Sequence, residues 1–285
     1  MKLLKLSIIT VLSLFITQIT LATDLGNHNK KFTDPTKMSK KDWTDPDELE
    51  RVWKAALVRI PKDNGKFDSS IMKDLTQKAD TIKKHPTIIY LHGCSGVWEG
   101  TYRRLNFFAK SGFAVIAPVS FAREKYPQSC DVKSHKGSMY RFTLKMRQID
   151  AGYAIEKAKQ LDWVDPNNVF LVGLSQGGVT TATYSSKNPG MSVKARVIEG
   201  WTCHAGWHEY RGINASKNEP VLSVLGYKDP WFKNSWSRGD CGSYMKNEAS
   251  RSVVFKDGHL STRHELLENK SVQNIVLDFL KKQIH

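Results

Sequence analysis

Residues 169–178 constrain the fold of this chain more than any other segment. They read VFLVGLSQGG, an apolar run that leads directly into a G-x-S-x-G pattern. The apolar run predicts a strand buried on both faces, and the residues from Val179 onward predict a helix. A sharp turn between the two would lift the Ser175 hydroxyl above the end of the sheet, and glycines at positions 173 and 177 would make room for neighbouring backbone. The segment therefore predicts an α/β protein with a reactive serine at the end of a central strand.

Apolar and amphipathic segments alternate on both sides of this turn. The predicted strands cover residues 55–60, 87–91, 113–117, 169–172, 196–198, 221–225 and 253–255. The predicted helices cover residues 67–82, 102–111, 138–161, 179–186 and 265–281. Strands that alternate with helices predict a mostly parallel sheet with helices on both faces. There is no internal repeat or linker, so we expect a single domain over residues 51–285. A polar arm over residues 23–50 precedes it, with a helix that begins only near Pro46.

The first 22 residues have the layout of a secretory signal peptide. Lys2 and Lys5 precede an apolar run over residues 6–16, and residues 20–22 (TLA) place small side chains where a signal peptidase cleaves. A transmembrane anchor is the alternative, but four polar residues interrupt a stretch that is already short for spanning a bilayer. We therefore expect a signal peptide over residues 1–22. The mature protein would be exported, periplasmic or secreted, with no transmembrane span after cleavage.

The chain has 43 Lys and Arg residues against 28 Asp and Glu residues, which gives a formal net charge of +15. These basic residues are spread along the chain, whereas nucleic-acid-binding proteins cluster them on one face. We therefore expect no nucleic-acid partner and interpret the charge as a solvated basic surface. Attraction to anionic membranes or polymers is the alternative. A composition that is 40% hydrophobic and 25% charged excludes a polytopic membrane protein and a wholly disordered one.

Four cysteines lie after the predicted cleavage site, at positions 94, 130, 203 and 241. An even number in an oxidising compartment predicts two disulfides in one of three possible pairings, with free buried cysteines as the alternative. Cys94 and Cys130 follow neighbouring strands at the same sheet edge, so we expect them to pair. Cys203 would then pair with Cys241. No two cysteines have the C-x-x-C spacing, so a zinc site or thioredoxin-like chemistry has little support.

A serine nucleophile requires a base, and the base requires a carboxylate that orients it. On a sheet of this kind the chain order is serine, then acid, then histidine, each at the carboxyl end of a strand. Strand 221–225 leads into Asp229, and strand 253–255 leads into His259. The sequence therefore predicts Ser175, Asp229 and His259 as a catalytic triad.

Other candidates for the acid and the base are weaker. Asp240 or Asp257 could replace Asp229. His204 and His208 precede the acid in the chain, and His264 is expected inside the last helix. The pair His204 and His208 has no third ligand nearby, so we expect no metal site.

A second loop offers an oxyanion hole. Residues 91–96 read LHGCSG at the end of the first central strand, where an H-G-x-x-G loop exposes backbone N–H groups. Such groups stabilise the oxyanion of a tetrahedral intermediate. We expect the amides of Cys94 and Gln176 to be the two donors.

With these motifs in this order, residues 84 to 283 resemble the dienelactone hydrolase family of α/β-hydrolases. The resemblance implies an α/β-hydrolase fold and hydrolysis of a carboxylic ester or lactone through an acyl-enzyme, with no cofactor or metal. Its best-known members are cytoplasmic and use a cysteine nucleophile, whereas this chain has Ser175 and a predicted signal peptide. An exported peptidase or polyester depolymerase on the same fold is an alternative. A catalytically idle fold that binds a polymer or partner is another.

The resemblance also implies how the substrate is held. Arg123 and Arg263 match positions at which the family has arginines that bind the acid group of the substrate, so the pocket is expected to favour carboxylates. Trp201 lies in an aromatic loop after the strand at residues 196–198, which we expect to form a wall of the pocket. That loop has only about twenty residues, too few for the lid of an interface-activated lipase.

Overall fold

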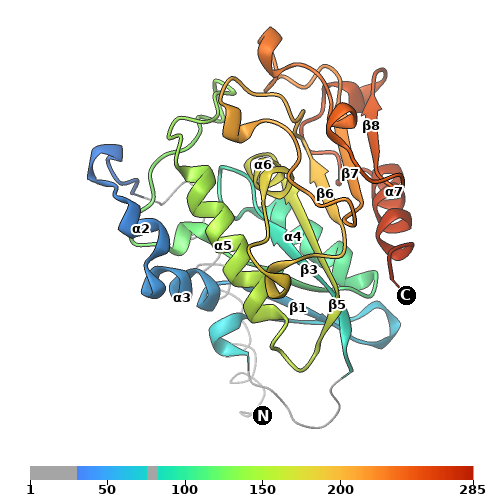
Figure 1. Cartoon of the computed structure of the whole chain (residues 1–285). Helices are drawn as coiled ribbons and strands as arrows, with labels where there is room; N and C mark the ends of the chain where they lie inside the picture. The colour runs from blue at the N-terminus through green and yellow to red at the C-terminus, as the bar shows by residue number, and fades with distance from the viewer. Residues whose placement is uncertain (1–30, 76–82, 285) are drawn as a thin grey trace, which may run out of the picture.

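The computed structural model describes residues 31–75 and 83–284, and the expected signal peptide lies outside the described residues. Eight strands form one sheet in the order β2-β1-β4-β3-β5-β6-β7-β8 (Figure 1). They are β1 (Leu57–Pro61), β2 (Phe67–Ile71), β3 (His85–Leu91), β4 (Ala114–Ala117), β5 (Val164–Leu174), β6 (Arg196–Glu199), β7 (Val221–Gly226) and β8 (Arg251–Phe255). Strand β1 pairs antiparallel with β2 and β4. The remaining pairs, which join β4, β3, β5, β6, β7 and β8 in that order, are all parallel.

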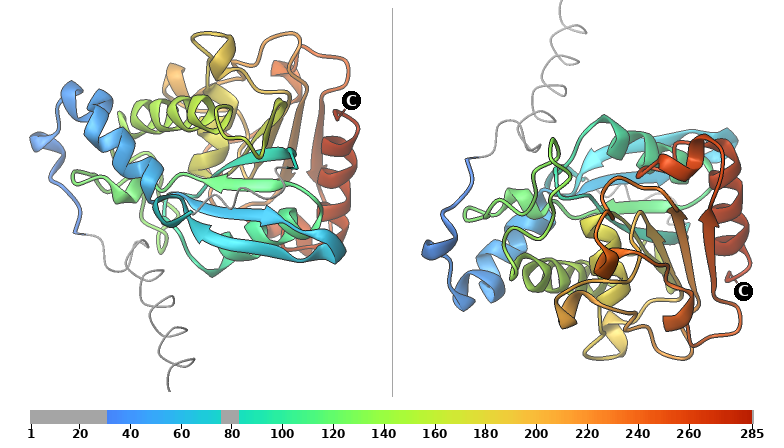
Figure 2. Two further views of the ribbon diagram at one scale, coloured as in Figure 1. Left: turned by 90° about the horizontal axis from the view of Figure 1, so that it is seen from below. Right: turned by 90° about the horizontal axis from the view of Figure 1, so that it is seen from above.

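Helices cover both faces of the sheet. They are α2 (Lys40–Thr44), α3 (Pro46–Lys54), α4 (Glu99–Lys110), α5 (Thr143–Ala158), α6 (Gln176–Thr183) and α7 (Lys270–Lys281). Alternate residues of the central strands point to opposite faces, so Ile88 packs with α4 and α7 while Ile89 packs with α3 and α5. Figure 2 shows α4 and α7 on the side opposite α5. The predicted α/β-hydrolase fold, with a mostly parallel sheet in a single domain, is confirmed. In the described part of the chain, no helix is long and apolar enough to cross a membrane.

The structure differs from the predicted helix at residues 67–82. Phe67–Ile71 forms strand β2, which runs antiparallel to β1, and residues 76–82 lie outside the described part. The turn between β1 and β2 contains Asn64 and Gly65 with φ values of 61° and 70°. An Asn-Gly pair suits such a hairpin turn, which folds the following residues back onto β1.

The last helix begins later than predicted. The side chain of Asn269 accepts a hydrogen bond from the Ser271 amide and caps α7, which therefore starts at Lys270 rather than at residue 265. The segment before it is a loop that contains His264, and this loop follows a 3-10 turn at His259–Thr262.

Residues 31–54 pack against the long connection between β4 and α5. The Thr33 amide donates to the Tyr126 carbonyl at 2.9 Å, and the Trp43 ring stacks on Phe142 with centroids 4.9 Å apart. This part of the expected arm contains α2 and α3, and α3 begins at Pro46. The arm therefore supports a connection that also lines the cavity described next.

Candidate active site

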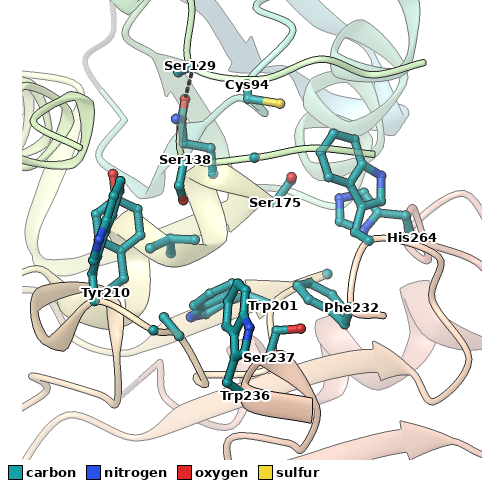
Figure 3. A pocket seen from close by; sticks show the side chains of 18 residues that line it. Cys94, Ser129, Ser138, Ser175, Trp201, Tyr210, Phe232, Trp236, Ser237 and His264 are labelled. Carbon is teal, nitrogen blue, oxygen red and sulfur yellow. Dashed lines mark hydrogen bonds between the residues drawn. The ribbon is translucent and has the colours of Figure 1, made fainter. Parts of the chain in front are cut away.

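Ser175 occupies the turn between β5 and α6 with φ 56° and ψ −117°, a conformation that side-chain-bearing residues rarely adopt. Its amide donates to the Glu199 carbonyl at 2.8 Å, which fixes the turn. A Cβ atom added at Gly177 would lie 2.0 Å from the Leu91 carbonyl oxygen, and one at Gly173 would lie 2.3 Å from the Gly177 carbonyl oxygen. Only glycine therefore fits on either side of the serine. Figure 3 shows the Ser175 hydroxyl pointing into a cavity.

Asp229 and His264 form a hydrogen-bonded pair beside that serine. Nδ1 of His264 lies 2.6 Å from Oδ2 of the buried Asp229 carboxylate, whose other oxygen accepts the Trp231 amide at 3.0 Å. Because the carboxylate only accepts, Nδ1 carries the hydrogen. Nε2 of His264 is buried and has no hydrogen-bond partner among the described residues. His264 lines the same cavity as Ser175, which leaves its Nε2 atom available for a proton.

The structure corrects the choice of His259. This side chain is exposed on the 3-10 turn after β8, and its Nε2 atom contacts the Asn269 side chain at 3.2 Å. It does not line the cavity. After this turn the chain passes close under the end of β7, where a Cβ atom at Gly226 would lie 2.6 Å from the Arg263 carbonyl oxygen. This path carries His264 to Asp229 and leaves His259 in solvent.

Glu199, at the end of β6, contacts both the turn of Ser175 and the loop that contains His264. It was not among the residues predicted from the sequence. Its backbone carbonyl accepts the Ser175 amide. Its buried carboxylate accepts the amides of Leu266 and Leu267, two and three residues after His264, at 2.7 and 2.8 Å. Arg104 of α4 forms two hydrogen bonds with the same carboxylate, at 2.8 and 3.0 Å. A glutamate that directly follows the apolar residues Val197 and Ile198 at the end of the strand was the signal for such a role.

Glu199→Gln should lower the free energy of unfolding by about 3 kcal/mol, because one partner of a buried ion pair loses its charge. Burial by itself lowers the pKa of Arg104, but the charge and hydrogen bonds of Glu199, together with Tyr90 and Glu265, outweigh this and the pKa lies above its usual value. The guanidinium stays charged in the variant, because arginine is not deprotonated in proteins. Urea unfolding measures the loss. The exposed pair Asp278 and Lys282 offers a matched control, and Asp278→Asn should change stability by less than about 0.5 kcal/mol. A loss below about 1 kcal/mol for Glu199→Gln would contradict the assigned role.

The two expected oxyanion donors lie at the same cavity. Cys94 and Gln176 both line it, and neither backbone N–H donates a hydrogen bond to another described group. The buried Arg147 of α5 lies behind this wall. Its guanidinium donates to the His92 carbonyl at 2.7 Å and to the Gln176 side-chain oxygen at 3.2 Å. Arg147 therefore connects the two segments that carry the expected oxyanion donors, and no sequence pattern indicated it.

Both predicted disulfides are confirmed. Cys94 pairs with Cys130, and Cys203 pairs with Cys241. The first bond attaches the oxyanion loop after β3 to the connection after β4. The second attaches the loop after β6 to the loop after β7, so each joins two segments that line the cavity.

The two arginines expected to bind substrate do not reach the cavity. Arg123 is buried and donates to Asp150 at 3.2 Å and to the Asp42 carbonyl at 2.6 Å, which ties the arm to α5. Arg263 is exposed and is not among the cavity residues. Trp201, in contrast, forms part of the cavity wall as expected. The two arginines therefore do not form the expected binding site for a substrate carboxylate.

The cavity has a volume of about 380 Å³, within the range of small-molecule sites. Its wall combines Ser175, His264 and the oxyanion segments with aromatic side chains from the loops after β6 and β7. These are Trp201, Trp207, Tyr210, Trp231, Phe232 and Trp236. Within residues 31–75 and 83–284, no three His, Cys, Asp or Glu side chains are grouped as metal ligands.

The parallel sheet with a serine at a strained strand-to-helix turn defines an α/β-hydrolase. Residues 74–252 match the model of the dienelactone hydrolase family. Because this match covers more than half of the chain, the chain belongs to the dienelactone hydrolase family, as the sequence motifs indicated. No curated protein matches the sequence.

Solved structures are similar to this chain at low sequence identity. A dienelactone hydrolase-like promiscuous phosphotriesterase from metagenomic libraries superposes with a TM-score of 0.51 at 12% identity, over 81% of this chain and 100% of that chain. Est1E from Butyrivibrio proteoclasticus has a TM-score of 0.47 at 17% identity, over 80% of this chain and 93% of that chain. A thermophilic esterase from Thermogutta terrifontis with bound butyrate has a TM-score of 0.49 at 15% identity, over 80% of this chain and 88% of that chain.

Proposed function

We propose that this protein is a serine hydrolase that cleaves a carboxylic ester or lactone through an acyl-enzyme. Ser175 is the nucleophile, His264 the general base and Asp229 the acid that orients it. The observation that carries the proposal is the 2.6 Å contact between Asp229 and His264 at a cavity that also contains Ser175. Membership of the dienelactone hydrolase family supports ester hydrolysis as the reaction class.

The first half of the reaction acylates the serine. Nε2 of His264 takes the proton from the Ser175 hydroxyl as its oxygen attacks the carbonyl carbon of the substrate. Asp229 keeps the hydrogen on Nδ1 and stabilises the positive charge that His264 acquires. His264 then protonates the leaving oxygen, and the alcohol departs while Ser175 retains the acyl group. For a lactone, the leaving oxygen stays attached to that acyl group.

The negative charge that develops on the carbonyl oxygen requires donors that are already in position. We assign this role to the amides of Cys94 and Gln176, because both residues line the cavity that contains Ser175 and neither amide has another partner among the described residues. In the second half, His264 deprotonates a water molecule that attacks the acyl carbon. The returned proton regenerates the Ser175 hydroxyl, and the acid product leaves.

We also propose that the protein acts after export. Two disulfides indicate an oxidising compartment, because thiols remain reduced in the cytosol of most cells. The predicted signal peptide would direct the chain to that compartment.

A fluorophosphonate probe tests this function without knowledge of the substrate. An activated serine attacks phosphorus and becomes covalently modified, whereas an ordinary serine does not. We expect one probe per folded chain by intact mass, on the peptide that contains Ser175. Urea-unfolded protein should stay unlabelled, because activation of Ser175 depends on the fold. No adduct on folded protein, or an adduct on another residue, would exclude the proposed nucleophile.

A further inference from the structure

The cavity beside Ser175 has no charged wall. None of the described residues that line it is lysine, arginine, aspartate or glutamate. Apart from His264, the ionisable lining group is Tyr210, whose hydroxyl donates to the Arg141 carbonyl at 2.8 Å, and burial raises its pKa. A substrate carboxylate in this cavity would therefore lose water without gaining a cationic partner, which is strongly unfavourable.

Two arginines near the cavity, Arg141 and Arg147, are engaged elsewhere. Arg147 donates to backbone and amide oxygens behind the oxyanion segments. Arg141 pairs with Glu209 at 2.9 Å, and its guanidinium lies 5.3 Å from the centroid of the Trp207 ring. Neither guanidinium is part of the cavity wall.

Aromatic rings surround the reactive groups instead, and neighbouring groups hold several of them in place. Trp231 stacks on the His264 ring with centroids 5.2 Å apart, and Phe232 meets Trp201 edge to face at 5.7 Å. Trp231 and Phe232 directly follow the turn that carries Asp229, so the same turn positions the acid and two walls of the cavity.

Trp236 differs from the other rings because it is 58% exposed while it lines the cavity. Its ring lies beside Gly206, where an added Cβ atom would be 3.8 Å away. Figure 3 shows Trp236 next to Trp201 on the wall across from Ser129 and Ser138. A large apolar ring left open at a binding site commonly marks a surface that a ligand covers. Trp236 therefore offers an exposed aromatic ring on which a ring of the substrate can stack.

We infer that the site hydrolyses esters that carry an uncharged aromatic ring in the acyl or the alcohol portion, and that this ring packs against Trp236. The inference rests on the proposed serine hydrolase function. It replaces the carboxylate specificity that the family resemblance implied, because the charged groups needed for that specificity are absent from the described cavity wall.

Three matched methyl esters test the acyl portion in a pH-stat assay: methyl 3-phenylpropanoate, methyl 3-cyclohexylpropanoate and monomethyl succinate. Benzyl acetate and cyclohexylmethyl acetate test the alcohol portion. We expect kcat/KM for the phenyl member of at least one series to exceed that of its cyclohexyl analogue by about fivefold, since ring–ring packing adds to area burial. Monomethyl succinate should react at least about tenfold more slowly than methyl 3-phenylpropanoate.

Substitutions assign the preference to one ring. Trp236→Ala should reduce the phenyl-to-cyclohexyl ratio to near one, and Trp236→Phe should preserve most of it. Tyr227 is 66% exposed and lies outside the cavity wall, so Tyr227→Ala is the matched control and should leave the ratio unchanged. A ratio of one or less in both series, an unchanged ratio in Trp236→Ala, or fast hydrolysis of monomethyl succinate would overturn the inference.

The fluorophosphonate probe separates this failure from a failure of the proposed function. Protein that labels at Ser175 but shows no aromatic preference would refute the substrate class and leave the hydrolase assignment standing. Protein that neither labels nor hydrolyses any of these esters would overturn both.

Discussion

Ser175→Ala should reduce kcat/KM for ester hydrolysis by about 10⁶-fold, the scale of loss when the nucleophile of a comparable triad is removed. The substitution removes the hydroxyl that we propose forms the acyl-enzyme, and no other described serine lies at the same turn. The unusual φ of 56° at this position belongs to the backbone, so alanine should adopt it at a cost similar to that for serine. Rates are measured with the most reactive ester found for the wild type.

The fold of this variant must be shown to be intact. Circular dichroism and urea unfolding should match the wild type, because Ser175 contributes no side-chain hydrogen bond that the structure records. Residual turnover above about 1% in purified variant would show that Ser175 is not the nucleophile, since the expected loss is orders of magnitude larger.

His264→Ala should lower kcat/KM by about 10⁶-fold as well, because loss of the base is as damaging as loss of the nucleophile in such a triad. His259→Ala is the matched control, five residues earlier in the same connection. Its side chain is exposed and outside the cavity, so activity should stay within about twofold of the wild type.

Comparison of the two variants shows whether His259, predicted from the sequence, or His264, proposed from the structure, is the general base. If His259→Ala were inactive and His264→Ala active, the contact between His264 and Asp229 would have no catalytic role. Equal and small effects in both variants would exclude a Ser-His-Asp mechanism altogether.

The turn at Ser175 and the position of Asp229 at the end of a strand could be predicted because each depends on local sequence. The G-x-S-x-G pattern after an apolar strand specifies its own turn, as the close approach at Gly177 shows. To predict the position of Asp229 it was enough to locate the end of strand β7, which a run of apolar residues marks. Both disulfides followed from the strand ends that carry the cysteines.

The histidine could not be identified in this way, because its position depends on where the last helix begins. Leu266 and Leu267 are buried although they are not helical, and they extend the apolar pattern of α7 towards His264. A helix over that stretch would have carried His264 away from the acid. The Asn269 cap was the opposing signal, since asparagine is favoured before the first helical turn.

Arg123 was misassigned for a different reason. A buried arginine takes the partners that the fold brings to it, and those of Arg123 lie 27 and 81 residues away in the chain. Spacing along the sequence does not report such contacts. The same is true of Arg104 and Glu199, which are 95 residues apart.

The arm that precedes β1 bears on how the protein is to be produced. Arg123 donates to the Asp42 carbonyl, Trp43 stacks on Phe142, and the Thr33 amide donates to Tyr126. All three contacts end on the connection that supplies Ser129 and Ser138 to the cavity. A recombinant fragment that starts at residue 51, the domain boundary predicted from the sequence, would lack all three of these contacts. We therefore expect the folding unit to begin no later than residue 33, and expression plasmids for crystallisation or assay should encode the chain from the predicted cleavage site onward.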